Sequence, residues 1–200
     1  MRLRACCAAL LMGWLLIPRI AQAEAFALDA GVGIQGIKLA GDGIGDVYSF
    51  GVGVGAEFGI TVSNLYRLAF SLNPTYGFGT PDSRPLASEP SGSLWSIPIL
   101  ATLQIPFLKK TPYIPYAGLG AGLHYVRESV SFTSGLGAKS QTESVTEFGW
   151  HVMAGVEQNR PTRLFGEVWF TRSSSGGIDG VIDGRNLGGL QLRIGYRRDL

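Results

Sequence analysis

The chain has 200 residues, which is enough for one domain, and a formal net charge of +2 at pH 7. Its only cysteines are Cys6 and Cys7, so the rest of the chain has no disulfide, thiolate metal site or cysteine nucleophile. Basic and acidic residues nearly balance, which gives no electrostatic basis for binding nucleic acid. Hydrophobic residues make up 46% of the chain, and glycines number 29. The apolar side chains must therefore lie in a protein core or against lipid.

The first 23 residues have the pattern of a signal peptide. Arg2 and Arg4 precede an apolar stretch, residues 5–18, which is too short to cross a membrane as a helix. Ala21-Gln22-Ala23 is a small-x-small cleavage motif. We therefore expect residues 1–23 to be a cleaved signal peptide and residues 24–200 to be the mature domain. An uncleaved membrane anchor is the alternative, which the short apolar core disfavours.

Side chains of two unlike kinds alternate in residues 112–126, PYIPYAGLGAGLHYV. Every second residue from Tyr113 to Tyr125 is apolar, with an aromatic ring at each end, and the residues between them are mostly small. A period of two indicates a β-strand with two unlike faces. An apolar face with aromatic ends and an aliphatic middle is typical of a strand that crosses a bilayer.

Seven more segments alternate in the same way, so the sequence predicts eight strands. Their predicted ranges, in chain order, are 26–38, 47–62, 66–78, 94–107, 112–126, 145–157, 163–172 and 190–198. Residues 80–93 are predicted to be a loop and residues 127–143 the longest polar connection. Long and short connections alternate along the chain, as in bacterial barrels whose two termini lie in the periplasm. The predicted fold is therefore all-β, an eight-stranded antiparallel up-and-down transmembrane β-barrel.

The outward-facing aromatic residues give an independent argument for a membrane. One group lies at the predicted outer ends of the strands: Tyr48, Phe50, Tyr76, Phe78, Trp95, Tyr125, Phe148, Trp150 and Phe170. The other group lies at the inner ends: Phe26, Phe58, Tyr66, Phe107, Tyr113 and Tyr196. Two aromatic girdles around an aliphatic band favour a membrane barrel over a lipocalin-like barrel or a β-sandwich.

Charged residues on the inward faces predict ion pairs inside the barrel. These residues are Glu57, Arg67, Arg163, Glu167 and Arg193. Eight strands leave an interior just wide enough for side chains, so charges there must pair. We predict a salt-bridge network that plugs the lumen. The alternative is a position at the wet periplasmic rim, which is equally compatible with Arg163 and is the preferred interpretation of Arg197.

A second group of inward residues lies near the outer ends of two consecutive strands. A single hairpin register would place His124 opposite His151 and Glu128 opposite Glu147. Such a cluster could form a metal or proton site at the rim. The alternative is a hydrated rim that binds no ligand. We predict no cofactor.

Three segments resemble the outer-membrane β-barrel family of small eight-stranded proteins, such as the OmpA transmembrane domain and OmpX. They are PYAGLGAGLHY (115–125), WHVMAGVEQN (150–159) and the closing LGGLQLRIGYRRDL (187–200). The resemblance implies a protein integral to the cell outer membrane. The expected partners are outer-membrane lipids and lipopolysaccharide, with periplasmic chaperones and the barrel-insertion machinery acting during assembly. The expected state is a monomer.

The resemblance does not determine one function, because small barrels differ in their loops. The favoured hypothesis is a non-enzymatic structural or surface-interaction protein with four longer outer loops. The first alternative is a narrow channel, because residues 97–108 and the PYAGLGAG that follows resemble OmpW-type barrels. The second is lipid A deacylation, because residues 170–178 are similar to the region around that catalytic motif. There Thr171 replaces the histidine, so Ser173 lacks a base.

Overall fold

The computed structural model describes residues 26–39, 50–62, 65–79, 88–108, 110–134, 137–174 and 188–200. The predicted signal peptide lies outside these residues. The strands are β1 (Phe26–Leu39), β2 (Phe50–Val62), β3 (Tyr66–Leu72), β4 (Thr75–Gly79), β5 (Ser88–Pro106), β6 (Tyr113–Ser134), β7 (Gly137–Gln158), β8 (Thr162–Ser174) and β9 (Gly189–Asp199). In the part of the chain that is described, no helix is long and apolar enough to span a membrane.

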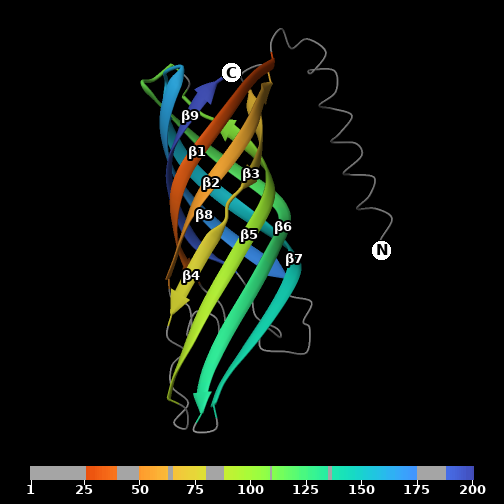
Figure 1. Cartoon of the computed structure of the whole chain (residues 1–200). Coiled ribbons are helices and arrows are strands. Elements are labelled where there is room, and N and C mark those ends of the chain that lie inside the picture. Colours follow the sequence, from red (N-terminus) through yellow and green to blue (C-terminus); the bar gives the residue numbers. More distant parts are fainter. Residues whose placement is uncertain are drawn as a thin grey trace, which may run out of the picture.

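The strands form one closed antiparallel sheet (Figure 1). Apart from β3 and β4, which do not pair with each other, each strand pairs with its neighbours in the chain, and β1 also pairs with β9, which closes the barrel. β3 and β4 share one position in the sheet, because both of them pair with β2 and with β5. The barrel therefore has eight strand positions, and the predicted fold class is confirmed.

The predicted strand 66–78 is interrupted at Asn73 and Pro74. Proline has no backbone N–H to give to a ladder. The Pro74 carbonyl instead accepts a hydrogen bond from the Val54 amide at 3.1 Å, and the Asn73 amide donates to the Pro98 carbonyl at 3.1 Å. Because two residues separate β3 from β4, both strands keep the same alternation of faces.

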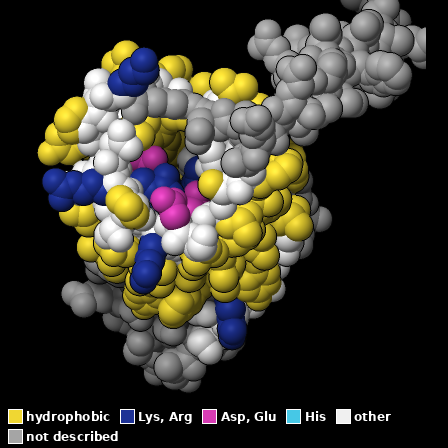
Figure 2. All heavy atoms as spheres, turned by 90° about the horizontal axis from the view of Figure 1, so that it is seen from above, with side chains coloured by type: hydrophobic (Ala, Val, Ile, Leu, Met, Phe, Trp, Pro, Cys, Tyr) yellow, Lys and Arg dark blue, Asp and Glu magenta, His cyan; other side chains and the backbone are white. Residues whose placement is uncertain are grey.

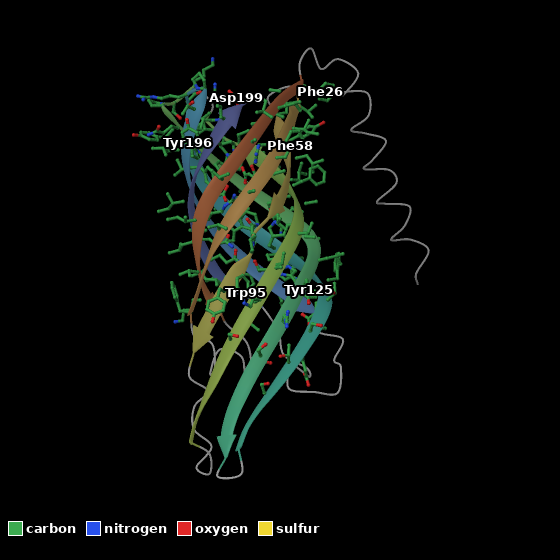
Figure 3. All side chains as sticks on the ribbon, in the orientation of Figure 1. Phe26, Phe58, Trp95, Tyr125, Tyr196 and Asp199 are labelled. Atoms are coloured by element: carbon green, nitrogen blue, oxygen red, sulfur yellow. The ribbon has the colours of Figure 1, made fainter. Side chains whose placement is uncertain are left out.

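The two ends of the barrel differ. One end, which we call the turn end, carries the short connections from β2 to β3, from β5 to β6 and from β7 to β8. Figure 3 shows Phe26 and Asp199 at this end, so both ends of the described barrel lie there. At the opposite end, which we call the loop end, β1, β4, β6 and β8 end.

β5, β6 and β7 extend beyond the other strands at the loop end (Figure 1). β6 and β7 pair without a break from Tyr113 and Gln158 to Ser134 and Gly137. The predicted connection 127–143 is therefore wrong, because most of it is strand. Part of the predicted loop 80–93 is also strand, because β5 begins at Ser88. These ends were missed because polar residues predominate on both faces there, so no sustained apolar alternation marks them.

The exposure of the side chains agrees with the predicted faces within the barrel. Outward aliphatic residues are exposed; Ile34 and Ile194, for example, are each 67% exposed. Figure 3 shows Phe26, Phe58 and Tyr196 toward the turn end, and Trp95 and Tyr125 toward the loop end. Aromatic side chains therefore flank the aliphatic band on both sides. Tyr48 and the side chain of Phe78 lie outside what the structure describes.

Candidate functional site in the barrel lumen

Ion pairs between buried side chains fill the lumen toward the turn end. The lumen charge network consists of Asp29, Glu57, Arg67, Glu157, Arg163, Glu167, Arg193 and Arg197. It contains four carboxylates and four guanidinium groups, so its charges balance. Figure 2 shows the barrel from the turn end, with acidic and basic side chains inside an opening that hydrophobic side chains surround.

Glu57 on β2 is the described carboxylate that accepts hydrogen bonds from the most guanidinium groups, three in all. It accepts hydrogen bonds from Arg67 at 2.9 Å and from Arg193 at 2.7 Å. The Arg197 guanidinium lies 2.6 Å from the same carboxylate. Arg67 comes from β3 and the other two arginines come from β9, so Glu57 joins three strands. The Glu57 side chain is only 1% exposed, so these charge-assisted bonds form away from bulk water.

Arg197 lies inside the network, so its predicted place at the wet rim is wrong. Its side chain is 1% exposed and also contacts Glu157 and, at 3.2 Å, Glu167. Its guanidinium lies 4.5 Å from the centre of the Phe165 ring, which is within cation–π distance. The residue opposite Arg197 on β1 is Gly31, so no side chain there keeps the arginine out of the lumen.

Arg163 lies at the edge of the network. Its side chain is 14% exposed and donates a hydrogen bond to Glu157 at 3.0 Å. It also pairs with Asp199, whose side chain is 52% exposed, and lies 3.6 Å from Asp29. Arg163 therefore links the buried ion pairs to the open turn end. It belongs to the lumen charge network and also lies at the rim, so each of the two positions predicted for it describes part of its contacts.

Aromatic side chains in the lumen donate hydrogen bonds to a carboxylate of the lumen charge network. Tyr116 donates its hydroxyl to Glu167 at 2.7 Å, and the Trp169 indole N–H donates to the other oxygen of that carboxylate at 2.8 Å. Trp169 and Phe165 are buried at 2% and 3% exposure. The network predicted from the sequence did not include these aromatic residues. Asp29 and Glu157 were also absent from the prediction, although both follow the inward alternation of their strands.

A cavity of about 300 Å³ opens at the turn end. Its lining includes Arg67, Gln104, Tyr116, Glu157 and Arg163. Glu57 and Arg193, with side chains that are each only 1% exposed, are absent from this lining. The cavity is thus a vestibule that leads to the lumen charge network.

Toward the loop end the lumen contains the second predicted cluster, His124, Glu128, Glu147 and His151, all of which are buried. The predicted pairing is wrong. His124 lies opposite Glu147, Glu128 lies opposite Glu143, and His151 lies opposite Gly120. The short connection between Ser134 and Gly137 fixes this register, which differs from the predicted one by four residues.

His151 contacts two other side chains of the lumen. Its Nε2 lies 2.9 Å from the Thr102 hydroxyl, and its ring stacks on Trp169 at a centroid distance of 4.6 Å. Among the described residues, no three His, Cys, Asp or Glu side chains are arranged to hold a metal ion.

The closed barrel, its apolar outer belt and its charged lumen define an integral membrane β-barrel. The sequence model of the outer membrane protein beta-barrel domain family matches residues 7–197. The chain belongs to this family, as the resemblance in its sequence predicted. Members of the family and the similar structures below are outer-membrane proteins, which supports the same location for this chain.

Three solved structures illustrate the similarity of fold. Neisserial surface protein A is 20% identical, with a TM-score of 0.52, and the match covers 89% of this chain and 99% of that one. Ail of Yersinia pestis, solved with the heparin analogue sucrose octasulfate, is 18% identical, with a TM-score of 0.51 and coverage of 86% and 98%. OprG of Pseudomonas aeruginosa is 13% identical, with a TM-score of 0.61 and coverage of 90% and 99%. No curated protein sequence matches the chain significantly.

Proposed function

We propose that this protein is a non-enzymatic outer-membrane barrel whose lumen is sealed and whose working surface faces the outside of the cell. The lumen charge network carries the proposal. Arg197 on β9 pairs with Glu57 on β2, past the intervening β1, and with Glu157 on β7, past the intervening β8, so its ion pairs bridge strands on both sides of β9 inside the lumen. A hydrated solute would have to separate these buried charges, and breaking one such pair costs about 3–5 kcal/mol.

The long strands at the loop end support a role outside the membrane. β6 and β7 each contain 22 residues, whereas about 9–11 residues are enough for a tilted strand to cross a bilayer. About half of each strand therefore projects beyond the membrane as a polar sheet that β5 joins. Ail, whose name is attachment invasion locus protein, has a similar fold, which supports contact with other surfaces as the class of function.

The charged lumen disfavours the narrow channel. The vestibule leads to the ion pairs of Glu57 rather than to an apolar passage. Its lining is rich in charged and hydrogen-bonding groups, and these already contact one another.

The burial of Ser173 disfavours lipid A deacylation. Ser173 is 2% exposed and faces the lumen, whereas a lipid substrate would approach from the outer surface. Thr171 has a histidine opposite it, His151, but both side chains are also buried in the lumen.

We further propose that the chain is a monomer surrounded by outer-membrane lipids and lipopolysaccharide. Periplasmic chaperones and the barrel-insertion machinery would deliver it.

Planar-bilayer recording tests the sealed lumen. We expect the purified barrel to leave the bilayer current at its baseline, because no hydrated path passes the ion pairs. The double variant Glu57→Ala/Arg193→Ala removes one carboxylate and one guanidinium group, which keeps the charge balance, and we expect it to give measurable current. Arg198→Ala changes only an exposed arginine and serves as the control. Regular stepwise openings of the unmodified barrel would contradict the proposal.

A further inference from the structure

Most carboxylates of the described barrel lie in the lumen, whereas basic side chains lie both in the lumen and on the outer surface. The exposed basic residues among those described are Lys38, Lys110, Arg127, Arg160, Arg172 and Arg198. Asp199 is the one exposed carboxylate among the side chains that the structure describes, and it pairs with Arg163. The described outer surface is therefore cationic, although the formal charge of the whole chain is only +2.

Three of these cations lie at the turn end. Lys110 is in the turn between β5 and β6, and Arg160 is in the turn between β7 and β8. Arg198 lies near the end of β9, directly opposite Thr162 at the start of β8. Figure 2 shows Lys and Arg side chains around the rim of this end, outside the charged opening. The three cations thus occupy one arc of the rim, from β5 to β9.

Hydrogen bonds between the two turns hold this arc in place. The Asn159 amide donates to the Pro112 carbonyl at 2.8 Å, and the Asn159 side-chain amide donates to the Thr111 carbonyl at 3.2 Å. Lys110 and Arg160 each lie next to a residue of these contacts. The backbone that carries both cations is therefore fixed on the barrel rather than free to swing into the periplasm.

Exposed aromatic residues place the arc at the membrane interface. Tyr113, three residues after Lys110, is 60% exposed, and Tyr196, two residues before Arg198, is 41% exposed. Outward tyrosines at the edge of an apolar belt lie at the depth of the lipid headgroups. Cations beside them are at the depth of the lipid phosphates, which guanidinium groups bind through paired hydrogen bonds.

We propose that Lys110, Arg160 and Arg198 form a binding site for anionic phospholipid headgroups, of the phosphatidylglycerol type, in the periplasmic leaflet. Short turns of outer-membrane barrels face the periplasm, so this arc meets the phospholipid leaflet. A cation near an anionic membrane surface contributes about a five-fold preference, which gives roughly 100-fold for three cations acting together.

Fluorescence quenching by brominated lipids tests this site. Tyr113→Trp places a reporter beside Lys110, and Trp95→Phe with Trp150→Phe removes the outward tryptophans toward the loop end. The barrel is refolded into phosphatidylcholine vesicles that contain either brominated phosphatidylglycerol or brominated phosphatidylcholine. We expect stronger quenching by the anionic lipid. The triple variant Lys110→Gln/Arg160→Gln/Arg198→Gln should lower that preference by roughly 10- to 100-fold.

A matched variant separates a local site from an effect of net charge. Lys38→Gln/Arg127→Gln/Arg172→Gln also removes three positive charges, but toward the loop end, and should leave the preference at the Tyr113→Trp reporter unchanged. Comparing unboiled with boiled samples on a detergent gel verifies that each variant is folded. The proposal is overturned if the parent reporter shows equal quenching by both lipids, or if the two triple variants lower the preference equally.

Discussion

The variant Glu57→Gln is expected to lower the free energy of unfolding of the barrel by about 3 kcal/mol. Removing one partner of a buried ion pair typically costs about 3–5 kcal/mol, because the remaining charge is left without compensation. The lower end of this range applies here, since each arginine keeps a second carboxylate. Arg67 retains Asp29, and Arg193 retains Glu167.

Urea titration of the barrel refolded in detergent or vesicles measures this loss, provided that unfolding is reversible. The control is Asp199→Asn, which removes the carboxylate of a pair that is half exposed at the turn end. Exposed pairs contribute about 0–1 kcal/mol, so this variant should remain close to the parent. Equal losses for the two variants would show that the lumen charge network does not stabilise the fold.

The variant Gly122→Ala is expected to destabilise the barrel by about 2–3 kcal/mol. A Cβ atom at Gly122 would lie 2.0 Å from the Ile99 carbonyl oxygen on the neighbouring strand β5. Because the obstacle is backbone, no side-chain rotation can relieve the contact, and the two strands would have to separate locally. The same stripe of β6 includes Gly120, where a Cβ would lie 2.2 Å from the Ala101 oxygen.

Gly166→Ala is the matched control for this variant. A Cβ at Gly166 on β8 would have no atom within 4 Å, so the substitution meets open space. We expect its free energy of unfolding to stay within about 0.5 kcal/mol of the parent or to rise slightly, since glycine weakens a strand interior. If both alanine variants unfold at the same urea concentration, close backbone approach is not the reason for the glycine at position 122.

The sequence predicted the faces of the strands better than their lengths. Within the membrane, apolar residues alternate with glycine and polar residues, and this contrast identified which side chains face out. In residues 127–143 polar residues predominate on both faces, and the apolar Val130 and Phe132 form only a short alternation, so the pattern did not distinguish strand from loop. The lengths of β6 and β7 therefore became visible only in the structure.

The sequence predicted which charges face the lumen but not how they pair. A period of two fixes the face of a residue, and any even shift between strands preserves every face. The alternation was thus equally compatible with His151 or Glu147 opposite His124, and the structure has Glu147 there. Alternation also does not indicate how far inside the lumen a side chain lies. Arg197 was therefore expected at the rim, although its side chain is buried beside Phe165.

The measurement that tests the central claim most directly is the gel mobility of the full chain expressed in a bacterium with an outer membrane. A closed barrel that resists detergent should migrate faster before boiling than after it, and the protein should be found in the outer-membrane fraction. Trimming of the chain at Ala23 would be read from the mass of the same sample. A protein that is soluble in the periplasm and shows no change of mobility on boiling would contradict the account.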